Sequence, residues 1–258
     1  PNVGQVDVPD ERLAKLSELV QPQRIVPTTI EFVDIAGLVK GASKGEGLGN
    51  KFLANIREVD AIVHVIRCFE DENILREEGE INPVGDKEII DTELQLKDLD
   101  SVEKKMQRYE KIAKNDPKAK RVYDVLVRCQ EYLSQGKNIR GLQLEGEELE
   151  AVADLFLLTQ KPVLYVANID EAAIHTGNKY SEALVKAATE EGAEVIVMNN
   201  SIEAQISEME NEDDKALFLS EYGLTEPGLN RLIRAAYKLL NLITYFTAGV
   251  QEVRAWTI

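Results

Sequence analysis

The chain has 258 residues, 44% of them hydrophobic, which is enough to bury a full core in one large domain or two smaller ones. It carries 46 acidic against 30 basic side chains, a formal charge of −16, and this balance argues against a DNA-coating protein. It contains no signal peptide and no apolar run of 18 residues, so we expect a cytoplasmic protein that does not enter a membrane.

Four short runs rich in β-branched residues and poor in charge predict buried parallel strands at 28–34, 61–66, 163–167 and 195–198. Helical patterns lie at about 50–58, 181–191 and 227–240. Strand, loop and helix repeated in this order predict an α/β fold with a doubly wound, mostly parallel sheet. Ligands of such sheets bind at the carboxyl ends of the strands. The residues just after the four strands are therefore the first candidates for a site: Asp34, Phe69, Asn168 and Ser201.

The first strand ends on Asp34 and leads into a glycine-rich loop, with Gly37, Gly41, Gly45, Gly47 and Gly49. A strand that ends on a carboxylate three residues before a glycine is the layout by which P-loop NTPases sense the γ-phosphate. The carboxylate reaches Mg²⁺ directly or through water, and the glycine N–H faces the phosphate. This pattern predicts Asp34 and Gly37 as catalytic residues, Asp34 as a Mg²⁺ residue, and a switch loop over 34–50.

Two other interpretations of the loop exist. It could be a surface loop with no function, although glycine-rich loops of this length are usually functional. A dinucleotide fingerprint at Gly45–Gly49 fails, because its first glycines must follow a strand directly, and Lys40 to Lys44 intervene.

After the second strand come two stretches with apolar residues at three- and four-residue spacing. The first has Leu99, Val102, Met106, Tyr109 and Ala113, and the second has Ala119, Val122, Leu126, Cys129 and Leu133. Asp116 is placed to cap the second stretch, and Pro117 stands at its first helical position. The pattern predicts an antiparallel helical hairpin with a narrow apolar seam.

The hairpin differs from the rest of the chain in charge. Residues 97–140 carry 12 Lys or Arg against 7 Asp or Glu, whereas the remaining residues carry a net charge of about −21. A cationic arm on an acidic body favours contact with a polyanion such as ribosomal RNA. Charges that only keep a coiled coil solvated are the alternative, and the sequence leaves both open.

The third strand is followed by Asn168-Ile169-Asp170-Glu171. GTPases normally have Asn-Lys-x-Asp here, and the Asp accepts two hydrogen bonds from guanine. Ile169 replaces the Lys, and the longer Glu171 shifts the carboxylate, so guanine discrimination should weaken. Ile169 could instead lie flat against an adenine. The alternative is that Asn168 and Glu171 are only turn residues that begin a helix.

Four segments, at 34–53, 60–70, 168–171 and 244–249, resemble the Obg-like ATPase (YchF) family of the Obg-related P-loop GTPases. The resemblance runs almost end to end. It implies a G domain that prefers ATP to GTP, an inserted helical hairpin, a C-terminal TGS-like domain and association with ribosomes.

The resemblance also implies roles for individual residues. Asn168, Ile169 and Glu171 would contact the base, Phe69 would pack on its other side, and Ser201 would lie in the bordering loop.

On the phosphate side, Asp34 and Gly37 would face Mg²⁺ and the γ-phosphate. Leu38 stands where Ras-like proteins have the Gln that orients the attacking water, so its side chain cannot do this. Some family members have a His after the Phe69 position that has been proposed to assist hydrolysis. Arg76 stands there in this chain.

We expect the G domain to comprise 1–85 and 146–240, the hairpin 86–145, and the start of a TGS-like domain 241–258. No Gly-x-x-x-x-Gly-Lys-Ser/Thr occurs in the 258 residues. The phosphate loop and the main Mg²⁺ ligands are therefore expected upstream of Pro1, in a longer protein. We expect the 258 residues alone to bind ATP weakly and to be inactive.

The sequence thus predicts a ribosome-associated P-loop ATPase that binds and hydrolyses ATP with Mg²⁺, in preference to GTP, as a nucleotide-dependent switch. One alternative is a nucleotide-regulated RNA- or ribosome-binding factor in which hydrolysis is incidental, which Leu38 favours. The other is a plain GTPase, which rests on Asn168 and is opposed by Ile169.

Overall fold

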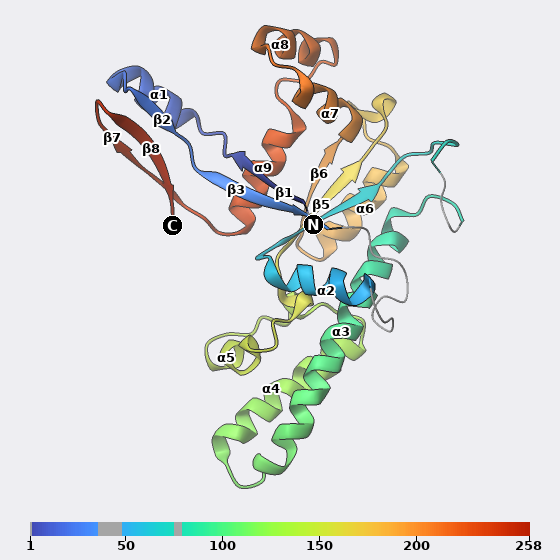
Figure 1. Cartoon of the computed structure of the whole chain (residues 1–258). Helices are drawn as coiled ribbons and strands as arrows, with labels where there is room; N and C mark the ends of the chain where they lie inside the picture. The colour runs from blue at the N-terminus through green and yellow to red at the C-terminus, as the bar shows by residue number, and fades with distance from the viewer. Residues whose placement is uncertain (1, 36–47, 75–78) are drawn as a thin grey trace. The chain divides into compact units, whose positions relative to one another are not determined.

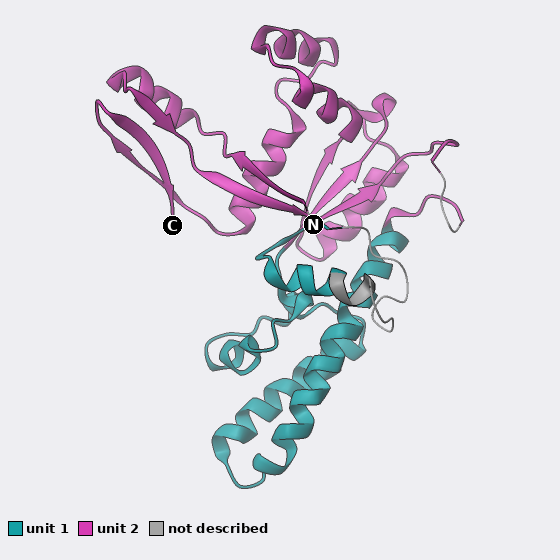
Figure 2. Cartoon of the chain, viewed as in Figure 1, with its two compact units in different colours: residues 1, 35–62, 84–162 teal, residues 2–34, 63–83, 163–258 magenta. Residues whose placement is uncertain are grey.

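The computed structural model describes residues 2–35, 48–74 and 79–258 (Figure 1). These residues divide into two compact units (Figure 2). We call residues 35–62 and 84–162 the hairpin unit, and residues 2–34, 63–83 and 163–258 the sheet unit. Within the described residues, no helix has both the length and the apolar character that a membrane span needs.

The sheet unit contains the parallel sheet that the sequence predicts. Its strands are β4 (Ile62–Arg67), β5 (Val163–Asn168) and β6 (Glu194–Met198), in the order β4-β5-β6. β5 and β6 pair in parallel, with Asn168 opposite Met198. Ile62 N donates to Pro162 O and Cys68 N to Asn168 O, a constant sequence offset that makes β4 and β5 parallel too. The fold class is therefore confirmed.

The central strand is fully buried from Val163 to Ala167, as expected for a strand with a neighbour on each side and covered faces. The described helices of this unit are α1 (Glu11–Val20), the short η3 (Glu171–Ala173), α6 (Lys179–Glu190), α7 (Asn200–Glu208), α8 (Glu212–Glu221) and α9 (Gly228–Leu239). Leu164 and Val166 pack with Ile233 and Tyr237 of α9 in the main apolar cluster.

The prediction that residues 28–34 form a buried parallel strand is wrong. β3 (Thr29–Asp34) pairs antiparallel with β1 (Asn2–Asp7). Ile30 is buried against the main cluster, whereas Thr29 and Glu31 beside it are exposed. This alternation is typical of a strand that buries one face only.

The end of the chain forms a second, smaller sheet with residues near the beginning. Its order is β2-β8-β7, with β2 (Arg24–Val26), β7 (Thr244–Ala248) and β8 (Glu252–Thr257). Leu13 of α1 (Glu11–Val20) packs on Val253 and Ala255 of β8. Residues 241–258, expected to begin another domain, therefore share a small core with α1.

The hairpin unit contains α2 (Leu48–Glu58), α3 (Pro83–Ile112), α4 (Pro117–Ser134), α5 (Glu147–Ala153) and the short helices η1 (Ile139–Leu142) and η2 (Leu158–Gln160). α3 and α4 lie side by side (Figure 1), and Val102 packs with Leu126 and Cys129. Asp116 caps α4 by accepting from Lys118 N at 2.8 Å. The predicted hairpin and its seam are thus confirmed. Burial raises the pKa of Cys129 to about 11, so this cysteine remains an apolar thiol.

The base of the hairpin is fixed by a buried carboxylate. Asp98 of α3 is completely buried, and its two oxygens accept from Leu158 N (2.8 Å), Thr159 N (2.7 Å) and Thr159 Oγ1 (2.7 Å). On the other side of η2, Lys161 Nζ donates to the carbonyls of Arg57 and Val59 at the end of α2. α2 and α3 are therefore joined through η2.

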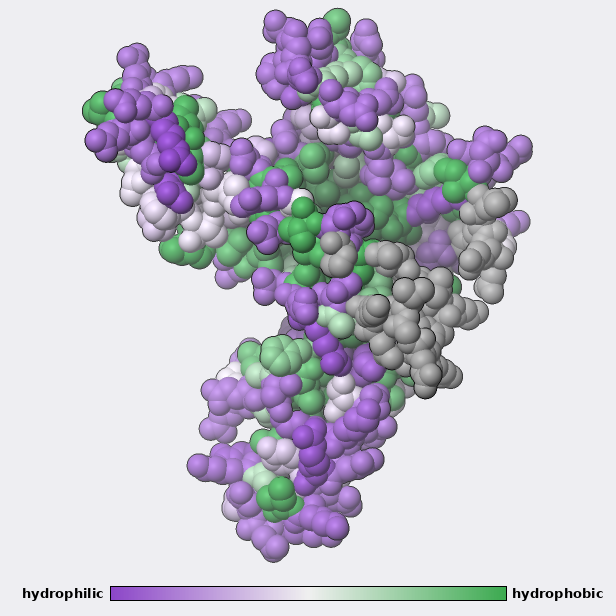
Figure 3. All heavy atoms as spheres, in the orientation of Figure 1, coloured by the Kyte–Doolittle hydropathy of each residue, from purple (hydrophilic) through white to green (hydrophobic). Residues whose placement is uncertain are grey.

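The basic residues of the hairpin are not equivalent. The face seen in Figure 3 is mostly hydrophilic there. Lys105, however, is only 6% exposed, and its Nζ donates to Ala151 O (2.8 Å) and Asp154 Oδ1 (2.5 Å). Lys105 belongs to the charges that were expected to contact a polyanion or to keep the hairpin solvated. For this residue both interpretations are wrong, because its charge is buried and paired with Asp154, and Glu at this position would bury a carboxylate beside Asp154.

Candidate functional site

Three loops meet where β4, β5 and β6 end. Cys68 N, just after β4, donates to Asn168 O at 2.8 Å. Ile169 N, just after β5, donates to Met198 O at 3.0 Å. The carboxyl ends of the three strands therefore lie side by side, where ligands of α/β sheets bind. The predicted base-side residues all lie at or just beyond these strand ends: Phe69, Asn168, Ile169, Glu171 and Ser201. Asn168 is the last residue of β5, and Ser201 lies in the first turn of α7, not in a loop as predicted.

Asn168 joins the second and third loops. It is half-buried, and its Oδ1 accepts a hydrogen bond from Asn200 N at 3.0 Å. This bond holds the start of α7, and with it Ser201, at a fixed place beside the end of β5. The side-chain nitrogen of Asn168 has no hydrogen-bond partner among the described residues, which leaves it available to a ligand.

Ile169 is not placed as an adenine contact requires. Its side chain is only 2% exposed, and its carbonyl accepts from Asn199 Nδ2 at 2.8 Å. A base could pack on this side chain only if the atoms that cover it moved. The base-contacting role of Ile169 stays a prediction. Its backbone is held in place by the hydrogen bonds of its N–H to Met198 O and of its carbonyl to Asn199 Nδ2.

Glu171 and Ser201 are both exposed and thus accessible to a ligand. Glu171 opens η3 (Glu171–Ala173), and Asp170 caps this turn by accepting from Ala173 N at 3.1 Å. Tyr222 lies near Glu171: partial burial, followed by the charge of the Glu171 carboxylate, raises the pKa of the Tyr222 phenol. The phenol therefore stays neutral and can donate to Glu171.

Three residues of this site were missed by the sequence analysis. Asn178 caps α6, and its Nδ2 donates to Cys68 O at 2.8 Å. Asn199 caps α7 by accepting from Ile202 N at 2.9 Å. Arg67 donates to the loop that carries Phe69. An Asn just before a helical pattern is a readable capping signal for the first two. Nothing in the sequence indicates the contacts of Arg67.

On the phosphate side, the structure describes Asp34, which lies exposed at the end of β3. It also describes Gly49, which lies in the first turn of α2 and not in a loop as predicted. Five predicted positions fall outside the described residues: Gly37, Leu38, Gly41, Gly45 and Gly47. Arg76 does as well. In the described part of the chain, no group of three or more His, Cys, Asp or Glu could hold a metal ion. Asp34 fits as one Mg²⁺ residue, directly or through water, but needs further ligands.

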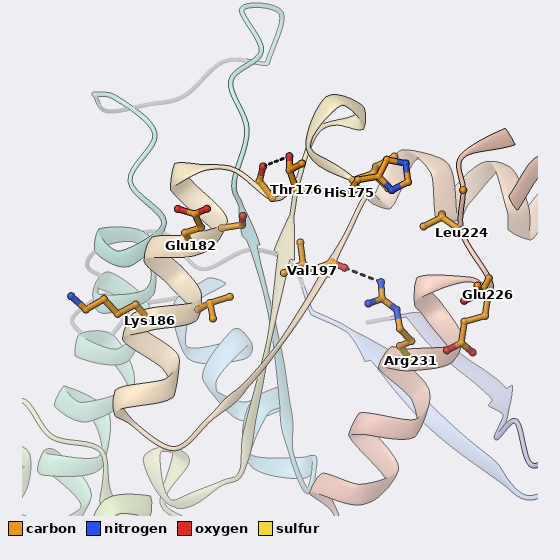
Figure 4. A pocket seen from close by; sticks show the side chains of 14 residues that line it. His175, Thr176, Glu182, Lys186, Val197, Leu224, Glu226 and Arg231 are labelled. Atoms are coloured by element: carbon orange, nitrogen blue, oxygen red, sulfur yellow. Dashed lines mark hydrogen bonds between the residues drawn. The ribbon is translucent and has the colours of Figure 1, made fainter. Parts of the chain in front are cut away.

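A cavity of about 620 Å³ lies beside these loops, along the outer edge of β6 (Figure 4). Glu182 and Lys186 of α6 form one side, and Leu224 and Arg231 form the other. Arg231 Nη2 donates to Val197 O at 2.9 Å, which satisfies an edge carbonyl of the sheet. None of the predicted base-side residues lines this cavity, so it is separate from the candidate nucleotide site.

Comparisons with known proteins show which family and which solved structure the chain resembles. The sequence pattern of a family described as 50S ribosome-binding GTPase matches residues 11–105. The ribosome-binding ATPase YchF of Escherichia coli O157:H7 is 53% identical over 100% of this chain and 71% of its own length. The ribosome-binding ATPase YchF of Bacillus subtilis is 52% identical over the same shares. The solved structure of the Schizosaccharomyces pombe YchF GTPase matches with a TM-score of 0.89 and 36% identity, over 100% of this chain and 70% of that one.

Proposed function

Because the chain belongs to the YchF family and has a P-loop G-domain fold, we propose that it is the nucleotide-binding part of a ribosome-associated ATPase that prefers ATP to GTP. The observation that carries this proposal is the junction of the three loops. Asn168 ties two of them together, and accessible Glu171 and Ser201 flank it. A base that enters here would meet polar groups held by the backbone of adjacent strands.

On the phosphate side, we propose that Asp34 holds Mg²⁺ directly or through water, and that Gly37 N–H faces the γ-phosphate. Bound Mg²⁺ would neutralise charge on the phosphates as water attacks in line. Leu38 has no group to orient that water, so the residues of this chain favour slow intrinsic turnover. Slow turnover also favours the second candidate, a binding factor in which hydrolysis is incidental.

The switch loop leads directly into α2, and this suggests how nucleotide state would reach the hairpin. Leu53 and Ile56 of α2 pack with Leu94 of α3 and Leu158 of η2, and Lys161 holds the end of α2. A movement of the loop would therefore be passed to α3 by packed, hydrogen-bonded elements.

Turnover by the longer protein, with and without ribosomes, tests the proposal. We expect slow ATP hydrolysis that ribosomes accelerate. Turnover that ribosomes do not change, with nucleotide-dependent ribosome binding intact, would favour the binding factor instead.

Substitutions in the segment 168–171 should change the preference between ATP and GTP. In the longer protein, Glu171→Asp combined with Ile169→Lys should shift the relative affinity towards GTP by about 1–3 kcal/mol, the scale of one buried base contact. Because Ile169 is buried, the Lys itself is expected to cost stability, so Glu171→Asp alone is the cleaner variant. ATP–GTP competition measures the shift, and Glu190→Asp, an exposed residue of α6, is the control. An unchanged ratio in both variants would mean that the base is read elsewhere.

We also propose that the hairpin contacts the ribosome or its RNA. Four basic residues at or near its turn are exposed and form no ion pair with a described residue: Arg108, Lys111, Lys114 and Lys118. Other basic residues of the hairpin are partly neutralised, as Lys104 is by Asp100 and Arg128 by Glu148, although Lys137 near the base is also exposed and forms no ion pair with a described residue. The turn thus carries four accessible positive charges close together in the sequence, where a polyanion could reach them.

A further inference from the structure

We propose that Arg67 is a positioning residue that fixes the ring of Phe69 for stacking on the base. This inference rests on the proposed function, because it assigns a task within the same nucleotide site. Arg67 is the last residue of β4, and Phe69 follows two residues later.

All three nitrogens of the guanidinium donate to one loop. Nε donates to Phe69 O (3.0 Å), Nη2 to Asp71 O (3.1 Å) and Nη1 to Ile74 O (3.1 Å). The loop therefore folds around a planar group whose donors point in fixed directions. No carboxylate among the described residues forms an ion pair with Arg67. The three hydrogen bonds of the guanidinium described above all go to backbone carbonyl groups of this loop. This pattern indicates that Arg67 fixes the conformation of the loop.

The same guanidinium also covers one face of the Phe69 ring. Its central carbon lies 4.9 Å from the ring centroid, within the range of a cation–π contact. A ligand can then stack only on the opposite face of the ring. Phe69 is half-buried, so part of the ring remains accessible.

Two further hydrogen bonds hold the start of the loop. Cys68 N donates to Asn168 O at 2.8 Å, and Asn178 Nδ2 donates to Cys68 O at 2.8 Å. Cys68 is thereby tied to the strand that ends on Asn168 and to the cap of α6. Beyond Cys68, Tyr180 and Lys179 of α6 hold the side chain of Glu70. Arg67 supplies what these contacts do not, since its hydrogen bonds fix backbone carbonyls of the loop, that of Phe69 included.

The test compares a ligand that has a base with one that lacks it. In the longer protein, Arg67→Ala should weaken ATP binding at least tenfold and leave the binding of inorganic tripolyphosphate unchanged within about twofold. Arg67→Lys keeps the positive charge but loses the planar set of guanidinium donors. Its ATP affinity should lie between those of Arg67→Ala and the unmodified protein. Arg231→Ala is the matched control, because this arginine also donates to a backbone carbonyl of the sheet unit but does not touch Phe69. The Arg231→Ala variant should bind ATP with the affinity of the unmodified protein.

A double variant decides whether Arg67 acts through Phe69. If it does, Arg67→Ala should add no further loss of ATP affinity in a Phe69→Ala background. Additive losses, or equal losses for ATP and tripolyphosphate, would overturn the inference. If Arg67→Ala fails to fold, Arg67→Lys carries the same comparison. An unmodified protein that binds tripolyphosphate as tightly as ATP would overturn the base site itself, a result that is distinguishable from failure of Arg67 alone.

Discussion

Replacement of Asp98 by alanine is expected to destabilise the hairpin unit by about 3–5 kcal/mol, because it removes the acceptor of three hydrogen bonds from a completely buried place. The N–H groups of Leu158 and Thr159 would be left buried without a partner. Asp98→Asn retains one acceptor oxygen but turns an NH₂ group towards one of these donors, so we expect a smaller loss of about 1–3 kcal/mol.

Because its two units need not unfold together, the chain is best followed by hydrogen exchange of the amides in α3, α4 and η2. Asp100→Ala is the control: this aspartate lies on the same helix, is about half exposed, and forms its ion pair among the described residues with Lys104 on the surface. Its loss should change stability by less than about 1 kcal/mol. Equal effects of the two alanine substitutions would show that the buried carboxylate does not hold the hairpin.

The same carboxylate should leave a signature in the pH dependence of stability. Burial raises the pKa of Asp98, although the hydrogen bonds from Thr159 and Leu158 act in the opposite direction. The folded protein therefore binds this proton more tightly than the unfolded chain. The stability due to this group is fully present below about pH 3.9, the ordinary value for Asp, and is lost as the pH rises through the raised value. The difference in free energy of unfolding between the unmodified protein and Asp98→Asn should therefore fall as the pH rises from about 3.9 to the raised pKa of Asp98. Above that pKa the difference should stay constant.

Features encoded by local periodicity and capping were predictable from the sequence. The three strands of the parallel sheet are short, apolar and rich in β-branched residues, and the hairpin seam repeats every three or four residues. Asp116 and Pro117 mark the start of α4 in the sequence as they do in the structure. Each of these signals lies within a few residues of the element that it specifies.

Features that depend on distant partners were not predictable. The antiparallel pairing of β3 depends on β1, a polar strand more than 20 residues earlier. Lys105 looks like any other lysine of a charged helix, and its burial becomes visible only when Asp154, 49 residues later, is placed beside it. Ile169 occupies a position that suggests a base contact, yet the fold covers its side chain. In each case the deciding neighbour is set by tertiary packing.

Reversal of three lysines near the turn of the hairpin should weaken ribosome binding by the longer protein at least about tenfold at moderate salt. The variant is Lys111→Glu, Lys114→Glu and Lys118→Glu, all exposed and outside the apolar seam. Each lysine that meets a phosphate releases counterions, so the dependence of affinity on salt should also flatten, by up to about three in the log–log slope. Co-sedimentation with ribosomes over a series of salt concentrations measures both effects.

The matched control is Lys15→Glu, Lys186→Glu and Lys238→Glu, which changes the net charge equally but on exposed positions of the sheet unit. If overall charge alone governed binding, the two variants would lose affinity equally. A site-specific contact predicts that the hairpin variant loses affinity and most of its salt dependence, whereas the control retains both.

The hairpin variant should still fold, so a loss of binding can be assigned to its charge. Lys118 lies in the first turn of α4, where a carboxylate interacts favourably with the helix dipole, and Asp116 keeps its capping bond to the Lys118 backbone N–H. Lys111 lies in the last turn of α3, where Glu costs only about 0.3–1 kcal/mol. Circular dichroism and ATP affinity should therefore match the unmodified protein. Unaltered sedimentation at low salt would mean that these lysines only solubilise the hairpin, and that the ribosome-binding surface lies elsewhere in the protein.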